Sequence, residues 1–376
     1  MTSDTLRQQV VFDNGPLAGG TAFANPIQTI RADTTDEVAS AFAKMEEAKA
    51  KGYWLAGYAS YELGYVFSPK LQDLMPLNRS LPLVHFGVFD APMPALTDQP
   101  AGYAKLANFA PQWDQGQYAA AFDQVKQYIS AGDIYQANLT FPLKAEYSGT
   151  PLALYHQLRL KQSVPYGAFV DLGGPPLLSR SPELFFSIDE FDRIETKPMK
   201  GTAARGTTPE EDAAQIAWLQ NSEKNQAENL MIVDLMRNDM SKLSQVGSVK
   251  VPDLFKVETY ATLHQLTSRI VAQLLPEITL FDIFEALFPC GSITGAPKIR
   301  AMQILRSLED DARGAYCGAI GWVAPTGEMQ FNVAIRTVVC HDGGTARLNV
   351  GGGVVYDSTP EDEYAEALLK SRYAAI

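Results

Sequence analysis

Hydrophobic and polar residues follow two different periods along this chain, one typical of helices and one typical of strands. Near the N-terminus, Asp36–Lys51 has a helical pattern and Tyr53–Ser60 a strand-like one. Apolar residues recur at helical spacing over 118–129, and Gly132 ends that helix before the strand-like run Ile134–Phe141. The pattern therefore predicts a mixture of helices and strands.

The C-terminal half carries stronger signals. A helix is predicted from about Ser222, a suitable N-cap residue, to Leu243. Pro297 stands where a helix over 296–308 would begin, a position at which proline is tolerated. Three strands and a last helix are predicted after it: Ala315–Val323, Met329–Val339, Arg347–Val355 and Pro360–Tyr373. Strands and helices in separate runs favour an α+β fold with antiparallel sheets over a doubly wound one.

Composition narrows the classes of protein. Of the 376 residues, 46% are hydrophobic and 20% charged, which is typical of a globular protein. The 31 Lys and Arg against 43 Asp and Glu leave a formal charge of −12, which argues against a nucleic-acid binder. An anionic substrate would therefore need a local group of cations or a metal ion.

Cysteine usage and hydropathy predict the compartment. Cys290, Cys317 and Cys340 are odd in number and widely spaced, which fits neither a disulfide framework nor a metal clip. The N-terminus lacks a secretory signal pattern, and no run approaches the roughly 20 apolar residues that a membrane helix needs. We therefore expect a cytoplasmic protein without membrane contact.

Two glycine-rich segments resemble phosphate-binding loops only superficially. Gly291–Lys298 lacks the spacing and the GK[ST] ending of a Walker loop, and Gly351–Gly353 lacks the GxGxxG spacing of a dinucleotide site. Three successive glycines let backbone N–H groups approach an anion such as a carboxylate. A strand bend or bulge explains them equally well, so both interpretations stay open.

Two predicted helices carry carboxylates. Glu363, Glu366 and Lys370 project from one face of the last helix, although an exposed ion pair is the simpler interpretation of these residues alone. Glu228 precedes an apolar run and so can face a core or a cleft. Carboxylates that converge from two helices without His or Cys partners suit Mg²⁺.

The segment Glu195–Thr202 (ETKPMKGT) holds two lysines around a proline. Gly201 follows Lys200, which predicts a sharp turn that presents the lysine side chain. A lysine becomes a nucleophile when a dry site or a neighbouring cation keeps it deprotonated, and Lys197 could supply that cation. A solvated basic turn is the alternative.

Several motifs occur together in one order, which resembles that of a known family. They are Arg180–Glu183 (RSPE), Thr196–Thr202 (TKPMKGT), Ala227–Asp239 (AENLMIVDLMRND), Gly291–Met302 (GSITGAPKIRAM), Ile335–Thr337 (IRT) and Gly351–Asp357 (GGGVVYD). The chain resembles the chorismate-utilising enzymes, which include anthranilate synthase component I, isochorismate synthase and aminodeoxychorismate synthase component I. The resemblance covers residues 117–376 strongly and extends through Trp54–Phe67.

This resemblance implies a fold and a division of the chain. The expected fold is that of anthranilate synthase component I, with two antiparallel β-sheets packed as a sandwich and helices on the outside. Residues 1–115 would form the N-terminal part of that fold, and residues 116–376 the chorismate-binding catalytic region. No LLES-like tryptophan-sensing signature occurs in the N-terminal part, so feedback control by tryptophan is not expected.

Two positions within the resemblance imply the reaction. Where isochorismate-forming members have a lysine base, this chain has Gln136, which implies ammonia rather than water as the nucleophile. Lys200 stands where anthranilate synthases usually have alanine, and it is similar to a covalent lysine nucleophile in relatives that form 4-amino-4-deoxychorismate for folate precursors. Anthranilate synthesis and a silent chorismate-binding subunit remain as alternatives.

The resemblance also implies roles for other residues. Glu183 would be the general acid for the hydroxyl that leaves ring carbon 4, which requires a raised pKa, and His264 would lie near that leaving group rather than in a core. Glu228, Glu363 and Glu366 would hold Mg²⁺. The implied substrate-binding residues are Gln136, Thr294, Tyr316, Arg336, Gly351, Gly352, Gly353 and Lys370. Ammonia would come from a separate glutamine amidotransferase subunit.

Overall fold

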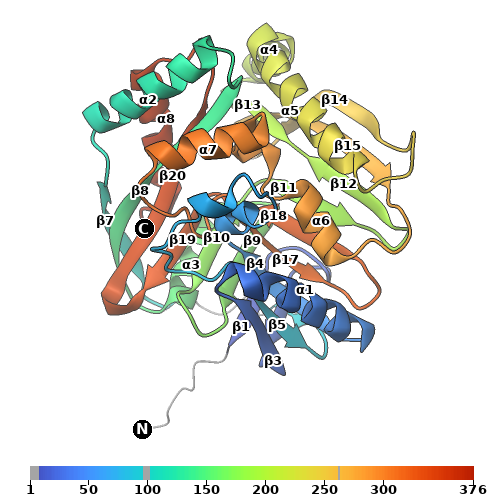
Figure 1. The fold of residues 1–376 in the computed structure, drawn as a ribbon. Helices are drawn as coiled ribbons and strands as arrows, with labels where there is room; N and C mark the ends of the chain where they lie inside the picture. Colours follow the sequence, from blue (N-terminus) through green and yellow to red (C-terminus); the bar gives the residue numbers. More distant parts are fainter. Residues whose placement is uncertain (1–7, 96–101, 261–262) are drawn as a thin grey trace.

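Two antiparallel β-sheets lie face to face, and helices cover the outer side of each (Figure 1). The computed structural model describes residues 8–95, 102–260 and 263–376. Within these residues each sheet has ten strands. This arrangement confirms the sandwich of antiparallel sheets that the sequence predicts.

The first sheet, called sheet A, contains strands from both ends of the chain. They are β1 (Gln9–Phe12), β2 (Thr21–Ala24), β6 (Met93–Pro94), β7 (Lys105–Pro111), β8 (Gln136–Ser148), β9 (Tyr166–Asp171), β10 (Leu177–Ser181), β16 (Gly295–Ala296), β19 (Thr337–His341) and β20 (Thr345–Val354). Their order is β16-β8-β20-β19-β10-β9-β1-β2-β6, and β7 pairs with β8. The helices that pack on sheet A are α2 (Gln115–Ser130), α3 (Pro151–Lys161), α7 (Lys298–Leu308) and α8 (Pro360–Leu369).

The second sheet, called sheet B, is built in the same way. Its strands are β3 (Gln28–Ala32), β4 (Trp54–Ala59), β5 (Val84–Phe89), β11 (Leu184–Ile188), β12 (Arg193–Lys197), β13 (Met199–Ala204), β14 (Lys250–Thr259), β15 (Leu263–Gln273), β17 (Ala319–Val323) and β18 (Met329–Val333). Their order is β13-β15-β12-β11-β18-β17-β4-β5-β3, and β14 pairs with β15. The helices that pack on sheet B are α1 (Thr35–Ala50), α4 (Pro209–Asn221), α5 (Glu223–Ser241) and α6 (Leu280–Leu287). Among the helices of the described residues, none has the length and apolar character needed to cross a membrane.

Most predicted elements are confirmed, with one informative error. Ser222 caps α5 as predicted, because its side chain accepts a hydrogen bond from the Asn225 N–H. The predicted strand Met329–Val339 is wrong, since it consists of β18 in sheet B and β19 in sheet A. The chain crosses between the sheets at Ala334–Arg336, where Arg336 has a φ of 51°. Buried apolar residues occur on both sides of the crossing, so their hydrophobic pattern does not reveal it.

A second crossing lies beside the first. Pro182 and Glu183 connect β10 of sheet A to β11 of sheet B. The two crossings are joined by backbone hydrogen bonds, from the Arg180 N–H to the Arg336 carbonyl (2.9 Å) and from the Val333 N–H to the Glu183 carbonyl (3.0 Å). Glu183 and Arg336 are therefore held between the sheets by the chain's change of layer.

A buried ion pair connects the segment after α7 to β8 of sheet A. The Glu309 carboxylate accepts hydrogen bonds from the Arg313 guanidinium (2.8 Å) and from the Thr140 N–H and hydroxyl (both 3.0 Å). Arg313 also donates to the Asn138 carbonyl at 2.7 Å. Because both Arg313 and Glu309 are buried, the pair ties the segment after α7 to β8.

We expect Arg313→Met to lower the free energy of unfolding by about 3–5 kcal/mol, because it leaves Glu309 buried without its charged partner. Denaturant titration measures the change. Arg300→Met, on α7 just before this segment, is the control: its exposed pair with Asp133 is worth at most about 1 kcal/mol. Equal stability of the two variants would contradict the assigned role of the buried pair.

Candidate active site

A cavity of about 160 Å³ lies where the chain crosses between the sheets. Its lining includes seven residues singled out from the sequence: Glu183, Lys200, Tyr316, Arg336, Gly351, Gly353 and Lys370. These residues come from both crossings, β13, β20, the segment before β17 and the end of α8. The fold thus brings together groups that are far apart in the sequence.

Glu183 is a buried residue in the lining of this cavity. Its side chain is 5% exposed, and Oε1 accepts a hydrogen bond from the Ser292 hydroxyl at 2.7 Å. Burial raises the pKa of Glu183 to about 7, although the Ser292 hydroxyl and the Lys200 ammonium act in the opposite direction. The raised pKa that a general acid requires is therefore present, and the carboxyl is partly protonated near neutral pH.

Ser292→Ala is expected to raise the pKa of Glu183 further, because the variant loses a hydrogen bond that stabilises the carboxylate. The alkaline limb of the kcat/KM profile should move to higher pH by roughly half a pH unit. Ser307→Ala is the control, since the Ser307 hydroxyl bonds to the Ile304 carbonyl within α7. A shift to lower pH, or the same profile for both variants, would contradict this assignment.

Lys200 leaves the regular strand pattern of sheet B. The register between β13 and β15 shifts between Met199 and Thr202, and Gly201 has a φ of 84°. Burial lowers the pKa of Lys200, the carboxylates of Glu228 and Glu183 raise it, and the ammonium of Lys370 lowers it; the net direction is downward. A lysine in this environment is more readily neutral, and hence more nucleophilic, than an exposed one.

Lys197 is not the cation beside Lys200, as the sequence suggested. Its ammonium forms an ion pair with Glu258 on β14. The cation that lowers the pKa of Lys200 is Lys370, at the end of α8. Sequence proximity was misleading because Pro198 separates β12 from β13, and a residue from the C-terminus completes the site.

Arg336 offers a positive charge to the cavity. Its backbone has a positive φ of 51° at the crossing into β19. Burial lowers the pKa of its guanidinium, and the neighbour that raises it is Tyr373 rather than a carboxylate. A half-buried guanidinium that faces a cavity in this way is suited to bind a substrate carboxylate.

The glycine run of β20 is regular strand rather than a bend. It pairs with β8 without a register shift, and on its other edge the pairing with β19 stops at Leu348. A Cβ on Gly352 would lie 2.5 Å from Glu363 Oε2, and one on Gly353 would lie 2.5 Å from Gln136 Nε2. Glycines at these two positions therefore let the β20 backbone lie close to Glu363 and Gln136. The bulge interpretation is wrong, because the strand pairing is regular.

Gln136 and Thr294 lie next to the cavity without lining it. Gln136 is fully buried beside Gly353, and neither of its side-chain amide atoms has a hydrogen-bond partner among the described residues. The Thr294 hydroxyl donates to the Cys290 carbonyl at 2.9 Å. The unsatisfied amide of Gln136 is available to a ligand, whereas Thr294 stabilises the turn that carries Ser292.

His264 is not brought into the cavity. It is fully buried on β15, where Nδ1 shares a hydrogen bond with the Thr259 hydroxyl (2.9 Å) and Nε2 with Asp212 (2.8 Å). Asp212 is in turn paired with Arg205. These contacts give His264 a role in holding α4 against β15, and its catalytic role stays a prediction.

The three carboxylates assigned to a metal come from α5 and α8. Glu363 accepts a hydrogen bond from the Ser358 hydroxyl (2.7 Å), and Glu366 pairs with Lys370 (2.8 Å). Burial and the Glu366 charge raise the pKa of Glu363, whereas Ser358 lowers it. Within the described ranges, no group of three or more His, Cys, Asp or Glu side chains is assembled closely enough to hold an ion. The donor chemistry, oxygen only, still fits a cation that keeps part of its water shell.

Ser292 and Asn138 are cavity residues that were not singled out from the sequence. Ser292 lies within the GSITG motif, and Asn138 follows Gln136 on β8. Each belongs to a segment that the resemblance covers, so the motif could have indicated that these residues lie near the site. A neutral hydroxyl or amide, however, has no charge that marks it as a candidate catalytic group. Their positions become informative only through the contacts with Glu183 and Arg313.

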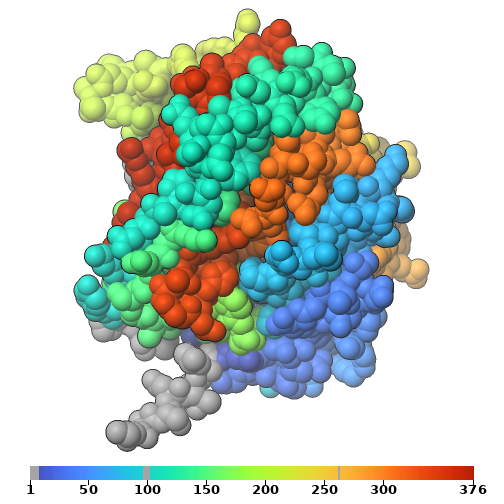
Figure 2. All heavy atoms as spheres, turned by 60° about the vertical axis from the view of Figure 1, so that its left-hand side comes forward, coloured from blue at the N-terminus to red at the C-terminus, as the bar shows by residue number. Residues whose placement is uncertain are grey.

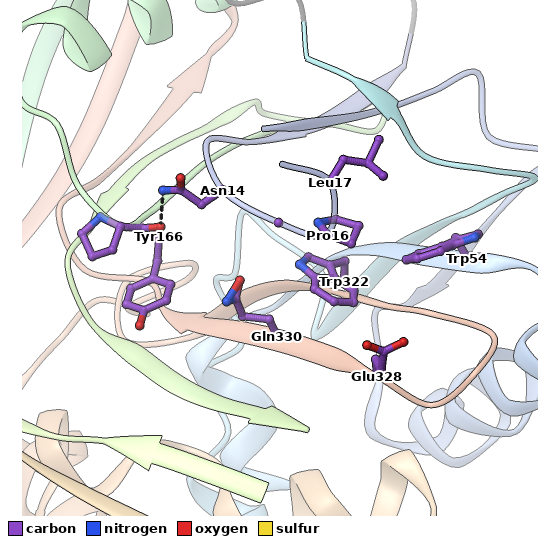
Figure 3. Close-up of a pocket in the computed structure, with 10 residues that line it drawn as sticks. Asn14, Pro16, Leu17, Trp54, Tyr166, Trp322, Glu328 and Gln330 are labelled. Carbon is purple, nitrogen blue, oxygen red and sulfur yellow. Dashed lines mark hydrogen bonds between the residues drawn. The ribbon is translucent and has the colours of Figure 1, made fainter. Parts of the chain in front are cut away.

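A larger cavity, of about 590 Å³, lies elsewhere between the sheets (Figure 3). Figure 3 shows Trp54 and Trp322 in its wall, and Asn14 at one end bonded to the Pro165 carbonyl at 2.8 Å. Its one charged lining residue is Glu328. A negative charge and aromatic walls do not suit an anionic substrate such as the resemblance implies, so size alone does not identify the active site.

Comparison with known proteins shows the family of the chain. The chain belongs to the chorismate binding enzyme family, which matches residues 7–375. It is 46% identical over 258 residues to an aminodeoxychorismate synthase of Streptomyces griseus, covering 69% of this chain and 36% of that protein. It is 45% identical over 254 residues to aminodeoxychorismate synthase component 1 of Escherichia coli, covering 68% of this chain and 56% of that protein. The matched region thus spans about a third to just over half of these relatives.

Solved structures confirm the fold. Anthranilate synthase component I from Streptococcus pneumoniae aligns with a TM-score of 0.80 and 26% identity, covering 100% of this chain and 93% of that one. The menaquinone-specific isochorismate synthase MenF of Escherichia coli aligns with a TM-score of 0.76 at 17% identity, covering 98% and 87%, which supports the fold alone. The anthranilate synthase component I-like fold predicted from the motifs is confirmed.

Proposed function

We propose that this chain aminates chorismate at ring carbon 4, as an aminodeoxychorismate synthase component I, and forms 4-amino-4-deoxychorismate. One observation carries the proposal: Lys200 and Glu183 line one cavity, and their environments shift their pKa values toward each other. A lysine that is more easily neutral and a carboxyl that is more easily protonated form a nucleophile and acid pair near neutral pH. The similarity to aminodeoxychorismate synthases supports the same reaction.

The residues of the cavity suggest how chorismate binds. Its carboxylates would be held by Arg336, by Lys370 and by the backbone N–H groups of the glycine run in β20. Gln136, with its unsatisfied amide, would orient the incoming amine beside Lys200. Ring carbon 2 would then face Lys200 while the hydroxyl on carbon 4 faces Glu183.

The reaction we propose has two displacements. The neutral Lys200 amine bonds to carbon 2, the ring double bonds shift, and the carbon 4 hydroxyl leaves as water with the proton of Glu183. Ammonia then bonds to carbon 4, the double bonds shift back and the carbon 2 to lysine bond breaks. The Glu183 carboxylate takes a proton from the new ammonium group, so both residues return to their starting states.

Mg²⁺ belongs to the proposal as a cofactor. Glu228, Glu363 and Glu366 would hold it, and when bound it supplies positive charge for a substrate carboxylate in a protein of net charge −12. Glu228→Gln is expected to weaken Mg²⁺ binding by at least about tenfold, measured by calorimetry in the presence of chorismate. Glu361→Gln, an exposed position in the first turn of α8, is the control. Equal Mg²⁺ affinity of the two variants would exclude Glu228 as a ligand.

A partner protein is also part of the proposal. The relative from Escherichia coli is named component 1, which implies a second component. We propose a glutamine amidotransferase that supplies ammonia, which makes the joint activity a transfer of the transaminase class for para-aminobenzoate and folate synthesis. A cytoplasmic location would suit this role.

A product assay tests the proposed function. The protein is incubated with chorismate, Mg²⁺ and ammonium, and the products are identified with and without an added aminodeoxychorismate lyase. We expect 4-amino-4-deoxychorismate alone, and para-aminobenzoate with pyruvate when the lyase is present. Anthranilate with pyruvate in the absence of the lyase would overturn the proposal in favour of an anthranilate synthase, and binding without turnover would indicate a silent subunit.

A further inference from the structure

A buried thiol that the proposed mechanism does not use, that of Cys290, lies two hydrogen bonds away from the Glu183 carboxyl. Cys290 precedes η3 (Gly291–Ile293), the short helical turn that brings Ser292 to the cavity. Figure 2 shows α7, the orange helix that follows this turn, at the surface, whereas Cys290 and Ser292 are buried. Ser292 is in the lining of the cavity and Cys290 is not, so the thiol can act only through its neighbours.

The direction of the two hydrogen bonds follows from the hydrogens available. Cys290 Sγ lies 3.2 Å from Ser292 Oγ, and Ser292 Oγ lies 2.7 Å from Glu183 Oε1. The Ser292 hydroxyl has one hydrogen, and an ionised carboxylate can only accept, so this hydrogen points to Oε1. Ser292 Oγ is then the acceptor for Cys290, and the thiol is the donor.

The surroundings of Cys290 keep its thiol protonated. Burial raises the pKa of Cys290 to about 12, and the charge of Glu183 acts in the same direction. The Ser292 hydroxyl and the Lys298 ammonium lower the pKa of the thiol by less. Cys290 is therefore a hydrogen-bond donor throughout the pH range in which Glu183 ionises.

Other groups also face the turn and the Glu183 carboxyl from neighbouring elements. They are the Met199 N–H and Lys200 on β13, Arg336 at the crossing, Lys370 after α8, and Lys298 of α7 with its partner Asp239 on α5. A substitution at Cys290 leaves all of them in place. A change in the ionisation of Glu183 that follows the thiol is therefore due to the contact with Ser292.

The orientation of the Ser292 hydroxyl determines which oxygen of Glu183 carries a proton. While Ser292 donates to Oε1, a proton on Oε1 would bring two hydrogens together, so the proton binds to Oε2. Without a donor behind it, the Ser292 hydroxyl could turn away and accept a hydrogen bond from a protonated Oε1. The proton would then be held by Ser292 and would not reach the leaving hydroxyl.

We propose that Cys290 is a positioning residue: its thiol holds the Ser292 hydroxyl on Glu183 Oε1, so that Oε2 carries the proton given to the leaving group. The inference rests on the proposed function, because that reaction assigns Glu183 as the general acid. The thiol also polarises the Ser292 hydroxyl and so strengthens its hydrogen bond to the carboxylate.

Infrared absorption of the S–H group tests these contacts without turnover. The S–H stretching band is separate from other protein bands and moves to lower frequency as the thiol donates more strongly. The Cys290 band, identified by its loss in Cys290→Ala, should move to lower frequency as the pH rises through about 7, where Glu183 ionises. In Glu183→Gln the band should not move. The band of Cys340, a buried thiol on β19, is the internal control.

The kinetic test compares three substitutions. Cys290→Ala should move the alkaline limb of the kcat/KM profile up by roughly 0.3 pH unit, because the carboxylate loses part of its stabilisation. Its kcat below pH 7 should fall by about two- to tenfold, because part of the protein carries the proton on Oε1. Cys290→Ser keeps a donor, so its limb should lie at or below the parental pH. Cys340→Ala, which removes another buried thiol, should match the parent.

A double variant separates positioning from packing. If the thiol acts only through Ser292, then Cys290→Ala introduced into the Ser292→Ala protein should change neither the alkaline limb nor kcat further. A further change as large as the one that Cys290→Ala causes in the parent would mean that the thiol acts by packing. That result would overturn the proposal.

Two results distinguish this inference from the function on which it rests. If the parent forms no aminated product but the Cys290 band follows the ionisation of Glu183, the proposed function alone is overturned and the placement of the proton by Cys290 is supported. If the parent aminates chorismate but the Cys290 band does not move with pH, the role of Cys290 alone is overturned. The same pH profile for Cys290→Ala and Cys340→Ala would also overturn it.

Discussion

Lys200→Ala is expected to lower kcat by about 10³-fold or more, because the variant lacks the amine that forms the covalent intermediate. The effect should not be a loss of stability, since Lys200 is half-buried and its ammonium forms no ion pair with the residues that the structure describes. Intact-mass measurement tests the role directly. Parent protein incubated with chorismate and Mg²⁺ without ammonia should gain the mass of chorismate minus one water, and Lys200→Ala should gain nothing.

A neighbouring lysine provides the matched control. Lys197 lies three residues earlier, but its side chain pairs with Glu258 and does not line the cavity. Lys197→Ala should therefore keep the covalent adduct and retain activity within a few-fold of the parent. An adduct that survives in Lys200→Ala would place the nucleophile on another residue and would remove the main support for the proposed mechanism.

Glu183→Gln is expected to lower kcat by about 10²–10⁴-fold, because an amide of the same shape cannot protonate the leaving hydroxyl. The pH profile gives a second signature. A general acid works in its protonated form, and burial raises the pKa of Glu183 to about 7. The kcat/KM of the parent should therefore fall as the pH rises through about 7, and the residual activity of Glu183→Gln should lack this alkaline limb.

Glu195→Gln is the control for this prediction. Glu195 lies on β12, pairs with Arg269 at 2.7 Å and does not line the cavity. Its replacement should leave both the rate and the alkaline limb unchanged. A normal alkaline limb in Glu183→Gln would show that another group supplies the proton, while a small loss of rate with a lost limb would mean that proton donation is not limiting.

The position of the site follows from the topology of the sandwich. Two of the points at which the chain changes sheet, after Ser181 and after Val333, are hydrogen-bonded to each other. A crossing interrupts the strand ladder, so its side chains can point into the space between the sheets. Glu183 and Arg336 lie between the sheets because they belong to these crossings, and glycines of β20 line the same cavity.

Several features follow from the sequence by itself. Helical and strand periods predicted α1, α2 and α5 closely, and the cap at Ser222, because local patterns and short-range hydrogen bonds determine them. Motif order predicted the family and the sandwich, which the comparisons confirm. The order of the motifs also indicated the seven cavity residues. A given reaction requires particular side chains, and in one fold these side chains occur in a fixed order along the chain.

The tertiary structure decided what depends on contacts between distant segments. It divided the predicted strand Met329–Val339 between two sheets, and the hydrophobic pattern does not reveal this crossing because buried apolar residues lie on both sides of it. It placed Lys370 rather than Lys197 beside Lys200, and it placed His264 with Asp212 outside the cavity. The pKa shifts of Lys200 and Glu183 arise from burial and from charges brought together by folding, and no local stretch of sequence contains that information.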